Sequence, residues 1–231
     1  MSPTPHSSFM DSISRWEGEW QADPNDSGNW VVCPTGRKLI GTMRGVTPAA
    51  LAQHLNLDPC DLYPAFMKDR VTLALAAEIG MKGYYHGPGF DKLRWSPLVA
   101  IAADIGWGSG PNRAIKMLQD LIGASADGKI GPRTKAAYDE ALADRPMGEL
   151  VDALTQVRRD FYLRISESSS KNHKFRKGWL RRADYYTTSN AEWWSQWTGA
   201  APVSPPSDPK AAARARILAA TEIIRQAIGE L

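Results

Sequence analysis

A small residue followed by proline recurs along the chain at spacings that suit the starts of helices. Such pairs stand at Thr47-Pro48, Asp58-Pro59 and Ser96-Pro97, and Gly110-Pro111 repeats the arrangement. A short polar side chain caps the free N–H groups of a first helical turn, and proline fits the first helical position because no N–H is needed there. The chain is therefore expected to consist mainly of helices that begin at these points.

Apolar residues recur at helical intervals between these starts, which predicts an all-α fold. A first helix of about three turns is expected from Ser8, with Asp11 completing a capping box, to about residues 18–20. The further predicted helices cover residues 48–55, 59–69, 72–82, 97–105, 111–122, 132–143, 147–165 and 175–186. The exception is a small β-hairpin expected near residues 30–42, with its turn at Pro34-Thr35-Gly36.

Charge and composition narrow the classes of partner. The 231 residues are 43% hydrophobic and 23% charged, and their net charge of +3 is too small to require a nucleic-acid partner. Basic residues gather in residues 158–186, and Val151, Leu154, Phe161 and Ile165 mark an apolar face of the helix that leads into this segment. We expect these charges to form the solvated side of the helix. We expect no nucleic acid to bind there, and no apolar run is long enough to span a bilayer.

Cys33 and Cys60 are the two cysteines of the chain. No spacing of cysteine and histidine residues suggests a zinc site, and two cysteines cannot build a disulfide framework. We expect two free, partly buried thiols, with a single disulfide as the alternative because the compartment is unknown. No metal ion and no organic cofactor are expected.

The two ends of the chain carry separate expectations. The first twenty residues lack a basic stretch followed by an apolar one, so no signal peptide is expected. Residues 199–209 predict a proline and serine linker, and residues 210–231 predict a helix with Ile217, Ile224 and Leu231 at seven-residue intervals. That helix could pack on the body, associate with a second copy or contact an outer-membrane surface. We favour a monomer.

The candidate catalytic groups are carboxylates that lie near aromatic residues in the sequence. Glu17 lies between Trp16 and Trp20, at a predicted helix end before a loop rich in Gly and Asp. Aromatic surface favours the neutral form of a carboxylic acid, and such an acid can protonate a glycosidic oxygen. Asp23 and Asp26 follow, and either could be a second carboxylate or a turn cap. The chain has nine tryptophans, whose flat faces suit sugar rings but also suit a core.

This opening resembles that of the glycoside hydrolase family 108 muramidases. WEGEW at residues 16–20, ADPNDSG at 22–28 and GTMRGVT at 41–47 follow the order and local spacing of the family's first three motifs. Glu19, Trp20 and Asn29 depart from the family pattern, and about a dozen residues before the third motif form an insertion.

The resemblance continues into a peptidoglycan-binding region. DGKIGPRT at residues 127–134 is its most specific part, and Gly178-Trp179 with Arg181-Arg182 are similar to its closing pattern. The resemblance implies a muramidase domain over residues 1–95, a helical wall-binding module over 96–187, and a linker with a C-terminal helix over 188–231. It implies an α-rich, lysozyme-like fold.

The resemblance also implies an activity and a set of site residues. It implies cleavage of the β-1,4 bond between N-acetylmuramic acid and N-acetylglucosamine in bacterial peptidoglycan, with Glu17 as the general acid and Asp26 and Thr47 as further catalytic residues. Thr42 and Thr47 could position water or an acetamido group, although Thr47 equally suits a helix cap. Contacts with substrate are expected from Trp16, Trp20, Asp23, Trp30, Asp127 and Arg133.

Four biological roles fit these motifs. We expect a phage endolysin that stays in the host cytoplasm before lysis and acts on the periplasmic cell wall. A bacterial muramidase that assists secretion and a lytic transglycosylase are alternatives within the same chemistry. A non-catalytic peptidoglycan-binding protein is the alternative from another class, motivated by the departures at Glu19, Trp20 and Asn29.

Overall fold

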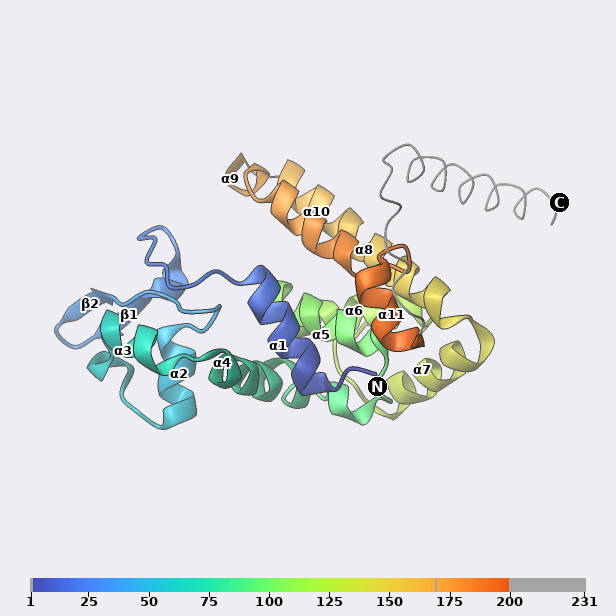
Figure 1. Ribbon diagram of the computed structural model, residues 1–231, viewed down its shortest axis with the longest axis horizontal. Coiled ribbons are helices and arrows are strands. Elements are labelled where there is room, and N and C mark those ends of the chain that lie inside the picture. The colour runs from blue at the N-terminus through green and yellow to red at the C-terminus, as the bar shows by residue number, and fades with distance from the viewer. Residues whose placement is uncertain (1, 169, 200–231) are drawn as a thin grey trace.

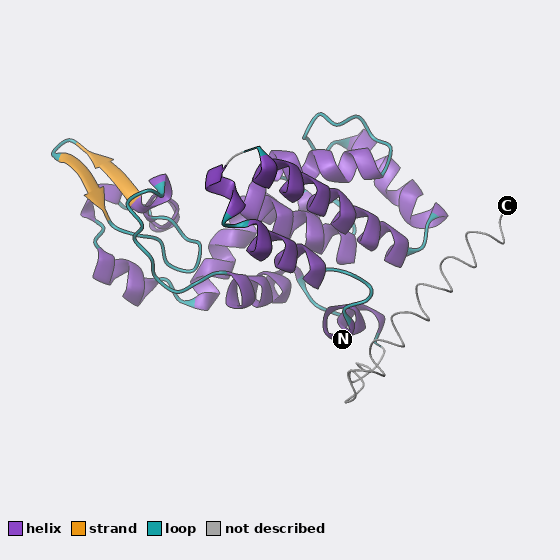
Figure 2. Ribbon diagram, turned by 90° about the horizontal axis from the view of Figure 1, so that it is seen from above, coloured by secondary structure: helices purple, strands orange, loops and turns teal. Residues whose placement is uncertain are grey.

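The computed structural model describes residues 2–168 and 170–199. Helices make up most of this part of the chain, and the sheet within it has two antiparallel strands at one end of the molecule (Figure 2). The predicted α-rich fold with a small hairpin is confirmed. The predicted C-terminal helix, and the linker after Gly199, lie outside the described residues.

The N-terminal lobe holds the hairpin and short helices, at the left of Figure 1. In the hairpin, Cys33 pairs with Gly36 next to the turn, and the antiparallel register continues to the pair of Trp30 and Leu39. The elements of this lobe are β1 (Trp30–Cys33), β2 (Gly36–Leu39), α2 (Pro48–Leu55), the 3-10 turn η2 (Pro59–Asp61) and α3 (Pro64–Arg70).

A body of longer helices packs around α5 (Pro97–Ser109), which contacts α1, α6 and α8 (Figure 1). The buried apolar residues of lobe and body form one continuous cluster, so the two parts share a core. The remaining elements are α1 (Pro5–Trp16), the 3-10 turn η1 (Ser27–Asn29), α4 (Leu73–Gly80), the π-turn η3 (Met81–His86), η4 (Phe90–Lys92), α6 (Pro111–Leu121), α7 (Pro132–Asp144), α8 (Met147–Glu167), α9 (Ser170–His173), α10 (Arg176–Tyr185) and α11 (Ala191–Thr198).

Several elements differ from the prediction. Helix α1 begins at Pro5 rather than Ser8, because Thr4 and Ser7 form the capping box, and it ends at Trp16. The helix predicted over residues 59–69 is split before Pro64, a residue that supplies no N–H donor to a helix interior. Helix α11 was not predicted, although Trp193, Trp194 and Trp197 stand at helical intervals, because residues 188–231 were assigned to a linker and a C-terminal helix.

The two cysteines do not stay free. Cys33 and Cys60 form a disulfide with their Cα atoms 5.7 Å apart, so the expectation of free thiols is wrong. Lys38 Nζ, on the neighbouring strand, donates to the Cys60 carbonyl oxygen over 2.7 Å. The disulfide therefore ties the hairpin to η2, which the sequence could not show because the cysteines lie 27 residues apart.

Removing this disulfide is expected to loosen the N-terminal lobe. A bridge that closes a loop of 27 residues restricts the unfolded chain, so Cys60→Ser should lower the free energy of unfolding by about 3 kcal/mol. Urea denaturation of the oxidised protein and of the variant measures the difference. Dithiothreitol should lower the free energy of unfolding of wild type by as much as the substitution does, and it should leave that of the variant unchanged. Such a result would assign the loss to the bridge. Equal stability of both proteins would contradict the prediction.

Candidate active site

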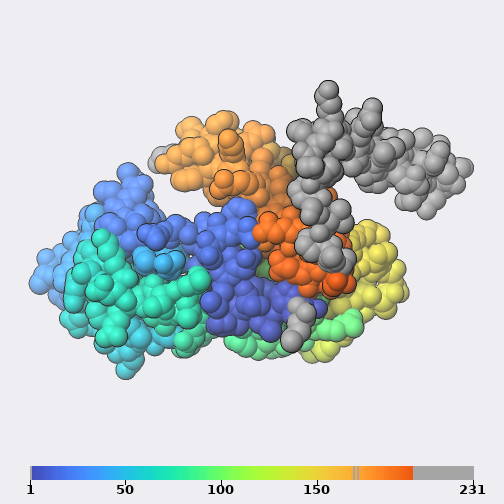
Figure 3. Space-filling model, viewed as in Figure 1, coloured from blue at the N-terminus to red at the C-terminus, as the bar shows by residue number. Residues whose placement is uncertain are grey.

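A cleft of about 520 Å³ opens between the N-terminal lobe and the helices of the body. The blue N-terminal segment and the orange helices α9 and α10 lie on its two sides (Figure 3). Both halves of the chain supply its walls. The lining residues are Glu17, Gly18, Glu19, Trp20, Gln21, Asp26, Gly28, Thr42, Gly45, Thr47, Tyr84, Trp107, Gly108, Tyr162, Trp179 and Arg182.

Glu17 is placed in this cleft by the end of α1. It is the C-cap residue with an extended backbone (ψ 131°), so its side chain leaves the helix axis at the cleft wall. Trp107 Nε1 and Arg182 Nη1 both donate to Glu17 Oε1 over 2.8 Å. The side chain is 20% exposed, and Oε2 accepts no hydrogen bond from the described residues. One carboxylate oxygen is thus fixed, and the other faces the cleft.

This setting differs from the expected one. Trp16 does not face the cleft: its ring packs edge-on against Tyr185, with the centroids 5.5 Å apart. Trp20 lines the cleft, but its Nε1 donates to the Ile40 carbonyl oxygen and Lys68 lies over its ring. The acid is therefore held by an indole N–H and a guanidinium from distant segments, and the expectation of apolar indole faces from its neighbours is wrong.

Trp107 is held in place by close packing. Its ring lies 4.9 Å from that of Tyr84 and 6.4 Å from that of Phe9. Gly45 also packs against this ring. A methyl group at Gly45 would lie 2.6 Å from Trp107 Cζ2 and 3.2 Å from Glu17 Oε2. Gly45 also has φ +76°, which favours glycine. The GVT element therefore needs its glycine both for backbone shape and for contact with the acid.

Replacing this glycine should damage both stability and activity. Gly45→Ala adds about 1–2 kcal/mol of backbone strain and about 1–3 kcal/mol of overpacking against Trp107. Thermal unfolding and clearing of purified peptidoglycan sacculi measure the two effects. Gly36→Ala is the matched control, because Gly36 has φ +119° but nothing within 4 Å of the added methyl group. Equal losses in both variants would show that contact with Trp107 and Glu17 is unimportant.

The loop carboxylate and the threonines lie on the lobe side of the cleft. Asp26 lines the cleft and accepts hydrogen bonds from Gly28 N on Oδ1 and from Gln21 Nε2 on Oδ2. Thr47 also lines it, but its Oγ1 caps α2 by accepting from Ala50 N. Thr42 Oγ1 is buried at the cleft wall and has no hydrogen-bond partner among the described residues. The Thr42 hydroxyl is therefore a buried, unpartnered group in the wall of the cleft.

A buried ion network fixes the guanidinium that holds Glu17. Arg182 donates through Nη2 and Nε to both oxygens of Asp104, over 2.8 and 3.1 Å. Arg158 Nη2 lies 2.7 Å from Asp104 Oδ2, and the hydroxyls of Ser12 and Tyr186 donate to Oδ1. These groups come from α1, α5, α8, α10 and the residue that follows α10. The network therefore joins the four helices behind the cleft.

The network also corrects one expectation about charge. Arg158 is fully buried, although we expected the basic residues of this segment to be solvated. Burial alone would raise the pKa of Asp104, but Arg182, Arg158 and the Ser12 hydroxyl outweigh it and hold that pKa well below its usual range. Asp104 is therefore ionised at neutral pH and balances two guanidinium groups.

Several residues expected to bind substrate lie away from the cleft. The Asp23 carboxylate accepts two hydrogen bonds from Asn25, which lower its pKa. Trp30 Nε1 donates to the Pro24 carbonyl oxygen, and Arg37 lies over its ring. Asp127 is held by Gln119 Nε2 and Lys129 N within its turn, and Arg133 is an exposed residue of α7. None of these four residues lines the cleft.

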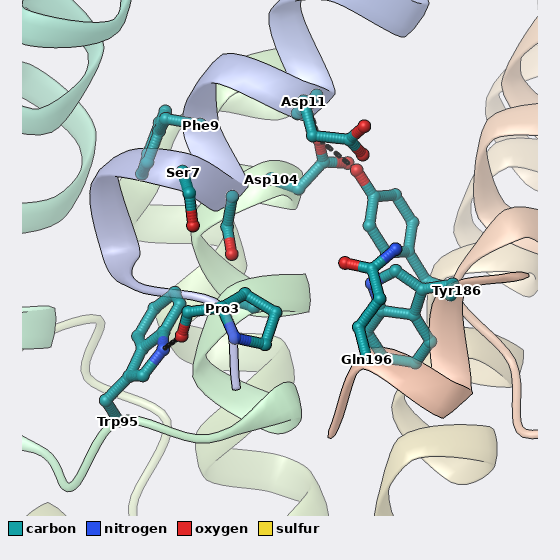
Figure 4. A pocket seen from close by; sticks show the side chains of 12 residues that line it. Pro3, Ser7, Phe9, Asp11, Trp95, Asp104, Tyr186 and Gln196 are labelled. Carbon is teal, nitrogen blue, oxygen red and sulfur yellow. Dashed lines mark hydrogen bonds between the residues drawn. The ribbon is translucent and has the colours of Figure 1, made fainter. Parts of the chain in front are cut away.

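A second hollow, of about 360 Å³, lies between the start of α1, Trp95 and α11 (Figure 4). Trp95 Nε1 donates to the Pro3 carbonyl oxygen at its edge, and Gln196 stands opposite. Asp104 reaches its wall, but Glu17 does not. Because the Asp104 oxygens are already taken by the ion network, the cleft around Glu17 is the better candidate for chemistry.

The described residues hold no group of three histidine, cysteine or carboxylate side chains suited to a metal ion. No helix among residues 2–168 and 170–199 has the length and hydropathy needed to cross a membrane.

The fold and the acid-bearing cleft between two helical parts define a lysozyme-like protein. Residues 10–110 match the family described as Glycosyl hydrolase 108, and residues 113–184 match the Predicted Peptidoglycan domain. The chain therefore contains a Glycosyl hydrolase 108 region followed by a predicted peptidoglycan domain, and these matches support a glycoside hydrolase.

The solved structures contain a similar fold. A structure of SagA from Brucella abortus is similar to this chain, with a TM-score of 0.59 and 24% sequence identity. The similarity covers 82% of this chain and 95% of the SagA chain. At that identity the likeness concerns the fold. No curated protein matches the chain.

Proposed function

We propose that this protein hydrolyses the β-1,4 bond between N-acetylmuramic acid and N-acetylglucosamine, with Glu17 as the general acid. The observation that carries the proposal is the fixed Glu17 carboxylate, held on Oε1 by Trp107 and Arg182 while Oε2 faces the cleft. Oε2 would carry the proton that passes to the glycosidic oxygen as the bond breaks. Arg182 and Trp107 would then stabilise the carboxylate that remains.

The second half of the reaction needs an attacking water. Asp26 and the unpartnered hydroxyl of Thr42 lie in the same cleft as Glu17. We assign to Asp26 the role of accepting a proton from water, and to Thr42 the role of orienting that water. The position of Asp23 outside the cleft favours Asp26 for this role. In this assignment Thr47 supports the site mainly as the cap of α2.

Peptidoglycan digestion followed by mass spectrometry tests the bond and the reaction together. Hydrolysis at the proposed bond leaves N-acetylmuramic acid at new reducing ends. A 1,6-anhydro end would instead show a lytic transglycosylase, and N-acetylglucosamine at the reducing end would show cleavage of the other glycosidic bond. Binding to sacculi without any released fragment would favour a non-catalytic wall-binding protein.

We also propose that the enzyme works outside the cytoplasm, as a phage endolysin that reaches the wall when the inner membrane is opened. The Cys33–Cys60 disulfide supports an oxidising workplace such as the periplasm. Bacteria that express the chain should lyse after a membrane-permeabilising agent is added, and not before. Lysis without that agent would instead favour a secreted enzyme of the bacterium itself.

A further inference from the structure

A basic hollow adjoins the catalytic cleft on the side of the peptidoglycan-binding domain. It has a volume of about 470 Å³ and lies between the end of α5, the start of α6 and α8. Three cationic side chains, Arg113, Lys116 and Arg164, line it, and Asp120 is the one acidic residue in its wall. We call this the basic hollow.

The basic hollow and the cleft share a wall. Gly108 lines the cleft and Ser109, the next residue, lines the hollow. Tyr162 lines the cleft and Phe161, the residue before it, lines the hollow, with their ring centroids 5.5 Å apart. The cleft and the basic hollow therefore lie on either side of one wall, which a branch of a ligand in the cleft would have to cross to enter the hollow.

The cations of the hollow are not neutralised by the protein. Arg113 lies over the Phe161 ring at 4.6 Å and donates weakly to the Ser109 carbonyl oxygen, so its guanidinium keeps most of its donors free. Among the described residues, none of Arg113, Lys116 and Arg164 forms an ion pair. All three are exposed, which makes them available to an anionic ligand. By contrast, the buried guanidiniums behind the cleft are already paired with Asp104.

We propose that the basic hollow binds the carboxylate groups of the peptide stem that branches from N-acetylmuramic acid. This inference rests on the proposed function, which places the glycan strand in the adjoining cleft. The stem leaves the sugar ring through its lactyl ether and carries free carboxylates, so it matches the charge of the hollow. Guanidinium groups suit carboxylates because their N–H donors form a planar fork. The hollow would therefore make the enzyme prefer peptide-substituted glycan whose carboxylates are not amidated.

Binding of a small muropeptide to the whole chain tests this proposal without turnover. The probe is N-acetylglucosaminyl-N-acetylmuramyl tetrapeptide, which lacks the bond that the proposed reaction cleaves, and its comparison is the same compound with amidated carboxylates. We expect wild type to bind the free acid about threefold to tenfold more tightly, as suits a few exposed ion pairs. Arg113→Gln/Arg164→Gln should bind both compounds with the weaker affinity, and Lys116→Gln should lose part of the preference.

The control variant is Lys82→Gln/Arg94→Gln, which removes the same charge from exposed residues that line neither hollow nor cleft. It should keep the preference. Equal binding of the two compounds by wild type, an unchanged preference in the Arg113 and Arg164 variant, or an equal loss in the control would each overturn the proposal. Because binding is measured apart from cleavage, a protein that prefers the free acid but releases no fragments would contradict the proposed function alone.

Discussion

Glu17→Gln is expected to reduce the clearing of purified sacculi by a factor of about 10²–10⁴, while binding to sacculi persists. The amide keeps the volume of the side chain and an oxygen that can accept from Trp107 and Arg182, so the cleft should keep its shape. It removes the proton that Oε2 would transfer. Turbidity of a sacculus suspension measures clearing, and co-sedimentation measures binding.

Glu19→Gln is the matched control for this variant. Glu19 lies two residues further along the chain and lines the same cleft, but no hydrogen bond to Trp107 or Arg182 holds it. Its change should leave clearing within a few-fold of wild type. A loss of clearing at Glu19 as large as that at Glu17 would move the acid role away from Glu17.

Asp104→Asn is expected to be the most destabilising single change at this site, at about 3–5 kcal/mol. It leaves the fully buried Arg158 without a balancing charge, and it leaves Arg182 with Glu17 as its remaining partner. Denaturant unfolding at pH 7 measures the loss. Asp139→Asn is the control, because Asp139 is an exposed partner of Lys135 on α7 and should cost less than about 0.5 kcal/mol.

The same carboxylate gives this effect a pH dependence of known sign. The pKa of Asp104 is lowered in the folded protein, so its ionised form stabilises the fold at all pH values above the unfolded pKa of about 4. That contribution is lost as pH falls below about 4 toward the folded pKa. The stability difference between wild type and Asp104→Asn should therefore shrink between pH 5 and pH 3, about the range of the unfolded pKa. A difference that stays constant over this range would contradict the assigned ion network.

Local signals in the sequence predicted most of the fold. Thr47 and Ser96 cap the helices that were expected to follow them, and the hairpin turns at Pro34-Thr35, within the predicted turn. These features depend on residues within one or two turns of each other. The disulfide and the start of α1 were missed because the first is a long-range contact and the second depended on a choice between two nearby caps.

The candidate site was half predictable for the same reason. Glu17 and Asp26 lie within one local motif, whereas the residues that hold Glu17 follow it by 90 and 165 positions. The sequence nevertheless contained two indications of the buried ion network. Asp104 interrupts an apolar run in α5, and Arg158 stands four residues after Leu154 on the apolar face of α8. A charged residue on an apolar face requires a buried partner.

The candidate active-site cleft is lined by both regions of the chain. Arg182, Trp179 and Tyr162 belong to the region that matches that domain, and all three line the cleft beside Glu17. The core is continuous between the two regions. The region that matches this domain therefore forms part of the wall of the candidate active site, and we propose that it contributes to catalysis as well as to binding.

The most direct test is a crystal structure of the Glu17→Gln variant with a peptidoglycan oligomer that contains the proposed bond. We predict that the oligomer occupies the cleft, with the bridging oxygen of the N-acetylmuramyl linkage within hydrogen-bond reach of the side chain at position 17. Density for the saccharide in the hollow beside Trp95, or a bridging oxygen out of reach of position 17, would contradict the assignment of Glu17 as the acid.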